Sequence, residues 1–332
     1  MENIHIVFTA PGIAELKREP VRQPKENEVL LKTLYSVISN GTERACLLDM
    51  PNVAGVFPRQ LGYCAISRVV RCGKLVTDFI PGDRALVYHG THSAYVTKTT
   101  EELTRVTEPV DSAEAAFVII AAMGLGGVRK LMVELGESAM VMGLGLLGLF
   151  AAQFLRLSGV YPVIAADPDP WRRELALATG ADFALDPLEN DFPEKVKALT
   201  WGKGVNATVE VSGAASALRQ ALDAAAWKGR IALLGCTRVS DVAIDYYQQV
   251  HRPGITLIGA HNFVRPRVDS YPGYWTHQDD CRILLRFLAA GKLRVREIMQ
   301  PAAAPSRAPE LYAQLARGEL PAGVYFDWSK LS

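Results

Sequence analysis

The chain has 332 residues, a formal net charge of +1 and 49% hydrophobic residues. This length allows two domains with a substantial core, and the balanced charge argues against nucleic acid or an anionic membrane as the main partner. The first residues lack the basic start and apolar core of a signal peptide, and the longest apolar runs are interrupted by glycine, charge or proline. The five cysteines are scattered and form no C-x-x-C pair, so we expect a protein of the reducing cytoplasm.

Residues 1 to about 120 are rich in short segments that alternate between apolar and polar residues. Such segments separated by close turns predict the strands of a small β-barrel. A short helix is expected from residue 112, with Ser112 as its capping residue. The expected strands are 3–10, 28–35, 65–71, 84–88, 93–97 and 103–106.

From residue 121 the pattern changes to strands that alternate with helices. Six strands separated by helices predict an α/β fold with a complete doubly wound parallel sheet. The strands are expected at 138–142, 162–166, 182–185, 207–211, 230–234 and 255–258, and the helices at 149–157, 171–179, 192–200 and 215–226. Two further helices, at 279–290 and 308–317, and a strand at 323–328 are expected in the remainder of the chain.

A glycine-rich loop joins the first of these six strands to its helix. In its G-x-G-x-x-G pattern, Gly143 permits a tight turn, Gly145 lets the backbone approach a pyrophosphate, and Gly148 lets helix and strand pack closely. The pyrophosphate would bind the free N–H groups at the start of the helix, where the dipole favours an anion. The sequence therefore predicts a dinucleotide site that also includes Leu146 and Leu147.

Asp167 closes the second strand of the sheet, nineteen residues beyond Gly148. This is close to the spacing of a carboxylate that binds the adenosine ribose and repels a 2′-phosphate, so NAD is favoured as the cofactor. Arg172 is a further candidate cofactor contact, or else a solvated residue at the start of a helix. Four residues at later strand ends are expected to line the nicotinamide side, namely Ser212, Gly235, Cys236 and Ala260.

Several motifs together resemble one known family over nearly the whole chain. They are Ser39-Asn40-Gly41-Thr42-Glu43, Gly82-Asp83-Arg84, the glycine-rich loop, Asp167 with Arg172-Arg173-Glu174, Gly180-Ala181-Asp182, Glu210-x-x-Gly213 and the strand from Gly229 to Gly235. The chain resembles the medium-chain dehydrogenases/reductases, the superfamily of alcohol, sorbitol and threonine dehydrogenases. The resemblance implies a GroES-like catalytic domain at 1–120, a Rossmann NAD-binding domain at 121–262, and a segment at 263–332 that returns to the first domain. It also implies a small-molecule alcohol or ketone as substrate, and a homodimer or homotetramer in which the sixth Rossmann strands pair across a dimer.

The zinc-ligand positions of that family carry other residues here. The zinc-dependent members have cysteine where this chain has Asn40 and histidine where it has Tyr63, and Cys64 replaces the acid that follows. Zinc favours thiolate, imidazole and carboxylate ligands, so we expect a member of the family without a metal. Nearby cysteines and histidines have a spacing that matches no metal motif.

Without zinc, side chains must move the carbinol proton while hydride goes to nicotinamide. Tyr63 would donate to a carbonyl oxygen, or it only fills the vacated metal position. Thr42 matches the relay hydroxyl of the family, or it bonds the backbone of a turn. Asn40 would hydrogen-bond the substrate oxygen.

Three further candidates have structural roles as alternatives. Glu43 matches the acid of the family motif, but an ion pair that holds the loop, with Arg44 or Arg68, is the favoured reading. His89 and His92 follow a barrel strand and are either bases near neutral pH or hydrogen-bonded loop residues.

Three functions remain open at this point. The favoured one is an NAD-dependent dehydrogenase of a secondary alcohol in a sugar, polyol, cyclitol or similar cyclic substrate. The aromatic stretch 271–277 would stack on such a ring, or it packs a loop. The second is a reductase of an activated double bond, which Asp167 disfavours, and the third is a non-catalytic NAD-binding protein.

Overall fold

The computed structural model describes residues 1–53 and 55–331. The chain divides into two compact units. Unit 1 contains residues 1–120 and 281–332, and unit 2 contains Ala121–Asp280. Within the described residues, no helix has the length and apolar character needed to cross a membrane.

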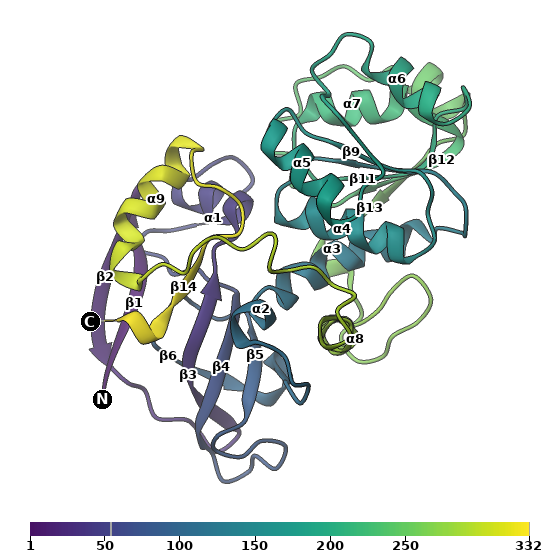
Figure 1. Ribbon diagram of the computed structural model, residues 1–332. Helices are drawn as coiled ribbons and strands as arrows, with labels where there is room; N and C mark the ends of the chain where they lie inside the picture. Colours follow the sequence, from purple (N-terminus) through teal and green to yellow (C-terminus); the bar gives the residue numbers. More distant parts are fainter. Residues whose placement is uncertain (54, 332) are drawn as a thin grey trace. The chain divides into compact units, whose positions relative to one another are not determined.

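Unit 1 contains a curled antiparallel sheet with the order β14-β3-β4-β5-β7, in which β6 also pairs with β3 (Figure 1). This is the GroES-like barrel domain that the sequence predicts. Separate from this sheet, β1 and β2 form a two-stranded hairpin. The elements are β1 (Glu2–Ala10), β2 (Ile13–Pro20), β3 (Glu28–Val37), α1 (Asn40–Leu47), β4 (Cys64–Cys72), β5 (Arg84–Tyr88), β6 (Tyr95–Thr99), the 3₁₀ turn η1 (Thr100–Glu102), β7 (Leu103–Arg105), α2 (Ser112–Ala115), η4 (Pro305–Arg307), α9 (Ala308–Arg317), β14 (Tyr325–Asp327) and η5 (Trp328–Lys330).

Side chains along a strand alternate between the two faces of a sheet, and this alternation explains how the barrel sheet of unit 1 forms its core. Alternate residues of β3 and β5 point into one core cluster, which includes Val29 and Leu31 of β3 and Ala85 and Val87 of β5. The sequence does not predict β2, because half of the residues in Ile13–Pro20 are charged and most are exposed. This segment forms a strand by pairing with β1.

Two local features of unit 1 differ from the sequence predictions. The cap of α2 is Asp111 and not Ser112, since the Asp111 carboxylate accepts hydrogen bonds from the amides of Ala113 and Glu114 at 2.8 and 3.1 Å. The motif that begins at Ser39 forms a helix, α1, for which the sequence carries no clear periodicity.

The end of the chain returns to the core of unit 1. β14 pairs antiparallel with β3, so that Tyr325 lies opposite Val37. The apolar face of α9, with Leu311, Tyr312 and Leu315, is buried in a cluster that also contains residues of β1 and α1. This return places side chains from both ends of the sequence in one core.

Unit 2 is a six-stranded parallel sheet with the order β10-β9-β8-β11-β12-β13. The six predicted strands and the doubly wound topology are confirmed. Its elements are β8 (Ala139–Met142), α4 (Leu146–Leu157), β9 (Val163–Ala166), α5 (Pro170–Thr179), β10 (Phe183–Leu185), α6 (Phe192–Leu199), β11 (Val205–Glu210), α7 (Ala215–Asp223), β12 (Ala225–Leu233), the π-helix η2 (Tyr246–His251), β13 (Thr256–Gly259) and η3 (Asn262–Val264). Two helices cross the unit boundaries, α3 (Val118–Leu131) and α8 (His277–Ala289).

Helices cover both faces of the sheet of unit 2 (Figure 1). One face carries α6 and α7, whose residues Phe192, Val196 and Ala221 pack on the apolar residues of the strands. The predicted helix 215–226 is too long, because the chain re-enters the sheet as β12 at Ala225. The helix α3 and the π-helix were not predicted, since their apolar residues follow no clear amphipathic period.

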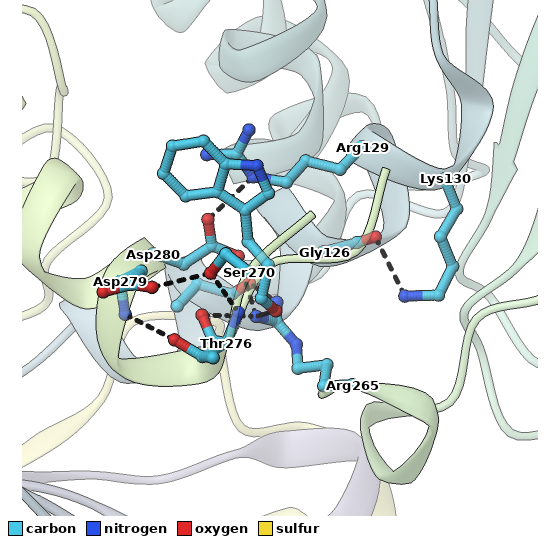
Figure 2. A network of polar contacts seen from close by, with 10 residues as sticks. Gly126, Arg129, Lys130, Arg265, Ser270, Thr276, Asp279 and Asp280 are labelled. Carbon is cyan, nitrogen blue, oxygen red and sulfur yellow. Dashed lines mark hydrogen bonds and ion pairs between the residues drawn. The ribbon is translucent and has the colours of Figure 1, made fainter. Parts of the chain in front are cut away.

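A buried ion-pair network fastens the segment after β13 to the rest of unit 2 (Figure 2). The carboxylate of Asp280 is fully buried and accepts from Arg129 Nε and Arg265 Nη1, each at 2.7 Å. Arg265 also donates to the carbonyl oxygen of Ala122. Residues 263–280, assigned from the sequence to the C-terminal segment, therefore pack within unit 2.

Candidate active site

The three glycines of the loop between β8 and α4 have three different surroundings. Gly143 has a φ of 97°, and a Cβ there would lie 2.8 Å from the backbone nitrogen of Ser212. A Cβ at Gly148 would overlap the carbonyl oxygen of Gly143, so only glycine allows the helix to pack this closely. Around Gly145 nothing lies within 4 Å of a Cβ position.

The first turn of α4 is suited to an anion. Gly145 is the capping residue of the helix and has no side chain to bond the free amides that begin with Leu146 and Leu147. The open surroundings of Gly145 and the unused amides fit a pyrophosphate at this helix start.

Asp167 directly follows β9, contacts the glycine loop and is 4% exposed. Its Oδ2 accepts from the amide of Leu144 at 2.7 Å and its Oδ1 from the amide of Asp169 at 2.9 Å. Arg172 lies 3.6 Å from Asp167 Oδ2 and 3.4 Å from Asp169 Oδ2. Arg172 is therefore an ion-pair partner of both acids, and each Asp167 oxygen keeps a further lone pair for a ribose hydroxyl.

A buried glutamate organises the ends of β11 and β12. Glu210 Oε1 accepts from the amides of Ser212 and Gly213 at 2.9 and 3.2 Å, and from the Ser212 hydroxyl. Burial raises the pKa of Glu210, while the bonds from Ser212 and Gly213 oppose this rise. A Cβ at Gly235 would lie 2.7 Å from the Gly213 nitrogen, so glycine is required where the strand ends meet.

The remaining predicted cofactor contacts also lie at this edge of the sheet. Cys236 is exposed, and its carbonyl oxygen lies 2.8 Å from a Cβ position on Gly213. Ala260 follows β13, is buried, and donates its amide to Leu233 at 3.1 Å. Like Ser212 and Gly235, these residues follow the carboxyl ends of strands, where doubly wound sheets bind their ligands.

In unit 1, the phenol of Tyr63 faces the start of α1. Tyr63 donates to the hydroxyl of Ser39 and lies 3.4 Å from Thr42 Oγ1. Burial raises the pKa of Tyr63 well above its ordinary value, although the bonds to Ser39 and Thr42 oppose this shift. The phenol is thus neutral at neutral pH, and its O–H group can donate a hydrogen bond. Ser39 was not among the predicted site residues, although it begins the motif that contains Thr42.

The first residue of α1, Asn40, has one free hydrogen-bonding atom. Its Nδ2 donates to the carbonyl oxygens of Leu320 and Pro321 at 2.9 and 3.1 Å. These two acceptors set the orientation of the amide and use both of its N–H groups. Its Oδ1 is buried without a partner among the described residues, so Asn40 can accept a hydrogen bond from a hydroxyl but has no donor left for a carbonyl.

Glu43 is fully buried at the centre of a polar network. Its Oε2 accepts from the Tyr312 hydroxyl at 2.5 Å and lies 3.2 Å from His92 Nε2, and its Oε1 accepts from the Ser39 amide at 2.9 Å. Glu43 therefore connects α1 to α9 and to the loop after β5.

His92 extends this network toward the end of the chain. Its Nδ1 lies 2.8 Å from Ser36 Oγ, which accepts from Trp328 Nε1 at 2.8 Å. Ser36 then donates to Nδ1, and the proton on Nε2 is directed at Glu43. No local pattern marks Ser36, Tyr312 or Trp328, and sequence reasoning missed them.

The predicted arginine partners of Glu43 are wrong. Arg44 donates to the carbonyl oxygens of Leu315 and Ala316, and Arg68 donates to that of Gly82. Glu43 has its partners among buried neutral or imidazole groups, which places it in the framework that positions α1.

Comparison with known proteins covers most of the chain. A family model described as zinc-binding dehydrogenase matches residues 147–272. D-guloside 3-dehydrogenase of Escherichia coli K12 is 26% identical over 333 aligned residues, which cover 93% of this chain and 95% of that protein. L-threonine 3-dehydrogenase of Pyrococcus horikoshii is 40% identical over 124 residues, 37% of this chain and 35% of that protein. These matches support the resemblance of the chain to the medium-chain dehydrogenase/reductase superfamily.

Solved structures agree with this assignment at the level of the fold. Galactitol-1-phosphate dehydrogenase of Escherichia coli has a TM-score of 0.86 at 18% identity, over 98% of this chain and 99% of that chain. A Sinorhizobium meliloti protein crystallised with NADP has a TM-score of 0.83 at 20% identity, with the same two coverages. The predicted combination of a GroES-like and a Rossmann domain is confirmed.

The remaining candidate residue, His89, lies in different surroundings from Tyr63. It directly follows β5 with a φ of 54°, and its ring stands 3.8 Å from that of Tyr88. Burial and then Lys98 lower the pKa of His89. It lines a pocket of about 340 Å³ together with residues of β2 and β6, and the lining includes none of Tyr63, Thr42 and Asn40.

The residues at the family's zinc position do not fit a zinc ion. The Asn40 amide nitrogen is occupied, the Tyr63 phenol is protonated, and burial raises the pKa of the Cys64 thiol well above its ordinary value. Zinc favours thiolate, imidazole and carboxylate. In the part of the chain that the structure describes, no group of three or more His, Cys, Asp or Glu side chains could hold a metal.

Proposed function

We propose that this chain oxidises a secondary alcohol of a sugar, polyol, cyclitol or similar cyclic substrate, or reduces the ketone, with NAD(H). The observation that carries the proposal is the position of the Tyr63 phenol, which donates to the hydroxyl of Ser39 and lies 3.4 Å from Thr42 Oγ1. The two relatives named above, both dehydrogenases, support a reaction of this type.

The residues of unit 1 account for the proton. A bound nicotinamide supplies or accepts the hydride at the carbinol carbon. During ketone reduction Tyr63 donates its proton to the carbonyl oxygen, and in the reverse direction the phenolate takes the carbinol proton. Ser39 and Thr42 hold the phenol and donate hydrogen bonds to the phenolate once the proton has left. The free Asn40 Oδ1 accepts from a neighbouring hydroxyl of the substrate, which favours a polyhydroxy compound.

NAD is proposed over NADP because of the surroundings of Asp167. Its carboxylate and that of Asp169 together compensate the charge of Arg172, so that this arginine is not free to bind a 2′-phosphate. Asp167 also repels such a phosphate directly.

The chain is proposed to act without zinc, because the side chains of Asn40, Tyr63 and Cys64 are poor zinc ligands.

We further propose a homodimer, or a tetramer built from it, in which β13 pairs with its copy. β13 is an edge strand of the sheet, and exposed apolar residues such as Phe263 and Val268 lie close to it in sequence. The five cysteines are scattered in the sequence and form no C-x-x-C pair, which supports the proposed cytoplasmic location.

The proposed function is tested by activity on a panel of sugars, polyols and cyclitols with NAD, with and without chelator, alongside metal analysis. NADH labelled with deuterium at the transferred position then identifies the reaction. We expect chelator-resistant turnover and label on a carbinol carbon. Label on an alkene-derived carbon would indicate a double-bond reductase, and no transfer over the panel would support a non-catalytic NAD-binding protein.

A further inference from the structure

Unit 2 contains a pocket of about 700 Å³ at the amino ends of β8, β11 and β12. It is lined by Ser138 before β8, Asn206 in β11, the start of β12, and the turn that follows α6. The glycine loop and Ser212 follow the carboxyl ends of β8 and β11. The pocket is therefore separate from the proposed cofactor site.

Two tryptophans line this pocket without being buried by the fold. Trp201 is 75% exposed and Trp227 is 69% exposed, and the structure records no ring contact between them. Trp201 has a φ of 52°, a backbone conformation that bulky residues rarely adopt and that costs about 1 kcal/mol or more. Burying an indole in a core normally stabilises a protein, so two exposed indoles in one pocket indicate a role in binding.

The polar groups of the pocket are donors and cations. Lys197 and Lys203 line it, and neither forms an ion pair among the described residues. Asn206 Oδ1 accepts from the amide and hydroxyl of Ser138 at 3.0 and 2.9 Å, which leaves its Nδ2 as a donor. No Asp or Glu is among the lining residues, and the neighbouring Glu137 is paired with Arg230.

We infer that this pocket binds a small anion that carries a flat ring, the class of aryl phosphates and nucleoside monophosphates. The ring stacks on Trp201 and Trp227, and the anionic group binds Lys197 and Lys203. Asn206 Nδ2 donates to an acceptor on the ligand. The volume is within the range of pockets that hold small ligands.

The probe for this inference is phenyl phosphate, titrated calorimetrically into the full-length protein without cofactor. Inorganic phosphate is the control for the anionic group alone, and benzyl alcohol is the control for the ring alone. We expect phenyl phosphate to bind at least about tenfold more tightly than either, because stacking and charge each contribute on the order of a tenfold factor. Equal affinity for phenyl phosphate and inorganic phosphate, or no binding of phenyl phosphate, would overturn the inference.

Variants locate the binding. Trp227→Ala should weaken phenyl phosphate binding about tenfold, and Trp227→Phe should restore most of it. The double change Lys197→Gln and Lys203→Gln should weaken the binding of phenyl phosphate. Lys195→Gln should not weaken it, because Lys195 lies on α6 like Lys197 but is paired with Glu189.

Two control measurements test whether phenyl phosphate binds at this pocket. Asp167→Ala should leave the affinity for phenyl phosphate unchanged, and a loss of affinity would place the probe at the cofactor site. The oligomeric state measured by sedimentation should be the same in Trp227→Ala and wild type. A change in that state without binding of phenyl phosphate would show that the indoles contact another copy of the chain.

Discussion

The cofactor loop of unit 2 and the Tyr63 site of unit 1 are built over very different distances in the sequence. Gly143, Gly148 and Asp167 belong to one strand–helix–strand segment. Gly148 and Asp167 contact backbone atoms of that segment, and Gly143 also approaches Ser212 after β11. The network around Glu43 joins residues 269 positions apart. A site made of local backbone geometry can be recognised from spacing, whereas a site made of buried side chains from both chain ends requires the fold.

The largest effect is expected in the Glu43 network. Glu43→Leu removes the acceptor of Tyr312 and the partner of His92, so the free energy of unfolding should fall by about 3–5 kcal/mol. Tyr312→Phe removes only one donor and should cost about 1–2 kcal/mol. Urea unfolding measures both, and an unchanged stability with lost turnover in Glu43→Leu would make Glu43 a catalytic residue.

The loop glycines should differ from each other. Gly148→Ala places a methyl group on the carbonyl oxygen of Gly143, so α4 must shift, at a cost of about 2–3 kcal/mol and with loss of NAD binding. Gly145→Ala meets no atom of the protein and should keep the stability while weakening NAD binding. Thermal unfolding and NAD titration of both variants test this, and equal stability losses would contradict the comparison.

Asp167→Ala should weaken NAD binding by about tenfold to a hundredfold and reduce the preference over NADP, because a ribose acceptor is lost and Arg172 is released. Arg173→Gln is a suitable control, since Arg173 donates to the carbonyl oxygens of Asp167 and Pro168 instead of the carboxylate. The ratio of kcat/KM for the two cofactors is the measurement. An unchanged ratio in Asp167→Ala would remove Asp167 from the ribose site.

In unit 2, the charges of Arg265 and Asp280 act on Lys130. The titration of Lys130 makes the stability of the protein depend on pH. Burial and the charge of Arg265 lower the pKa of Lys130 to about 8, and Figure 2 shows Lys130 directed at the carbonyl of Gly126. Between this pKa and the ordinary value of 10.5, the unfolded chain holds a proton that the folded chain has released, so stability rises with pH. Lys130→Met should flatten this rise and stabilise the protein by about 1 kcal/mol at pH 7. A slope as steep as that of the wild type would show that other groups cause it.

Periodicity and turn chemistry were sufficient for the parallel sheet and most of the barrel. They missed β2, whose residues are charged and exposed, and they extended α7 into β12, because the segment from Ala215 to Ala226 is apolar enough for either structure. At the candidate site, the motif positions identified Thr42, Glu43 and Tyr63. The partners of these residues could not be predicted, since Ser36, Tyr312 and Trp328 meet them only after β14 and α9 return to unit 1.

Tyr63 is proposed as the proton donor of a dehydrogenase that acts without zinc. The most direct measurement is the single-turnover rate of ketone reduction at pH 7 by Tyr63→Phe, with Tyr35→Phe as the control from the same unit. We predict a rate that falls by about 10²- to 10⁴-fold in Tyr63→Phe, with NADH affinity unchanged, and a wild-type rate in Tyr35→Phe. A wild-type rate in Tyr63→Phe would contradict the claim and assign the proton transfer to another group.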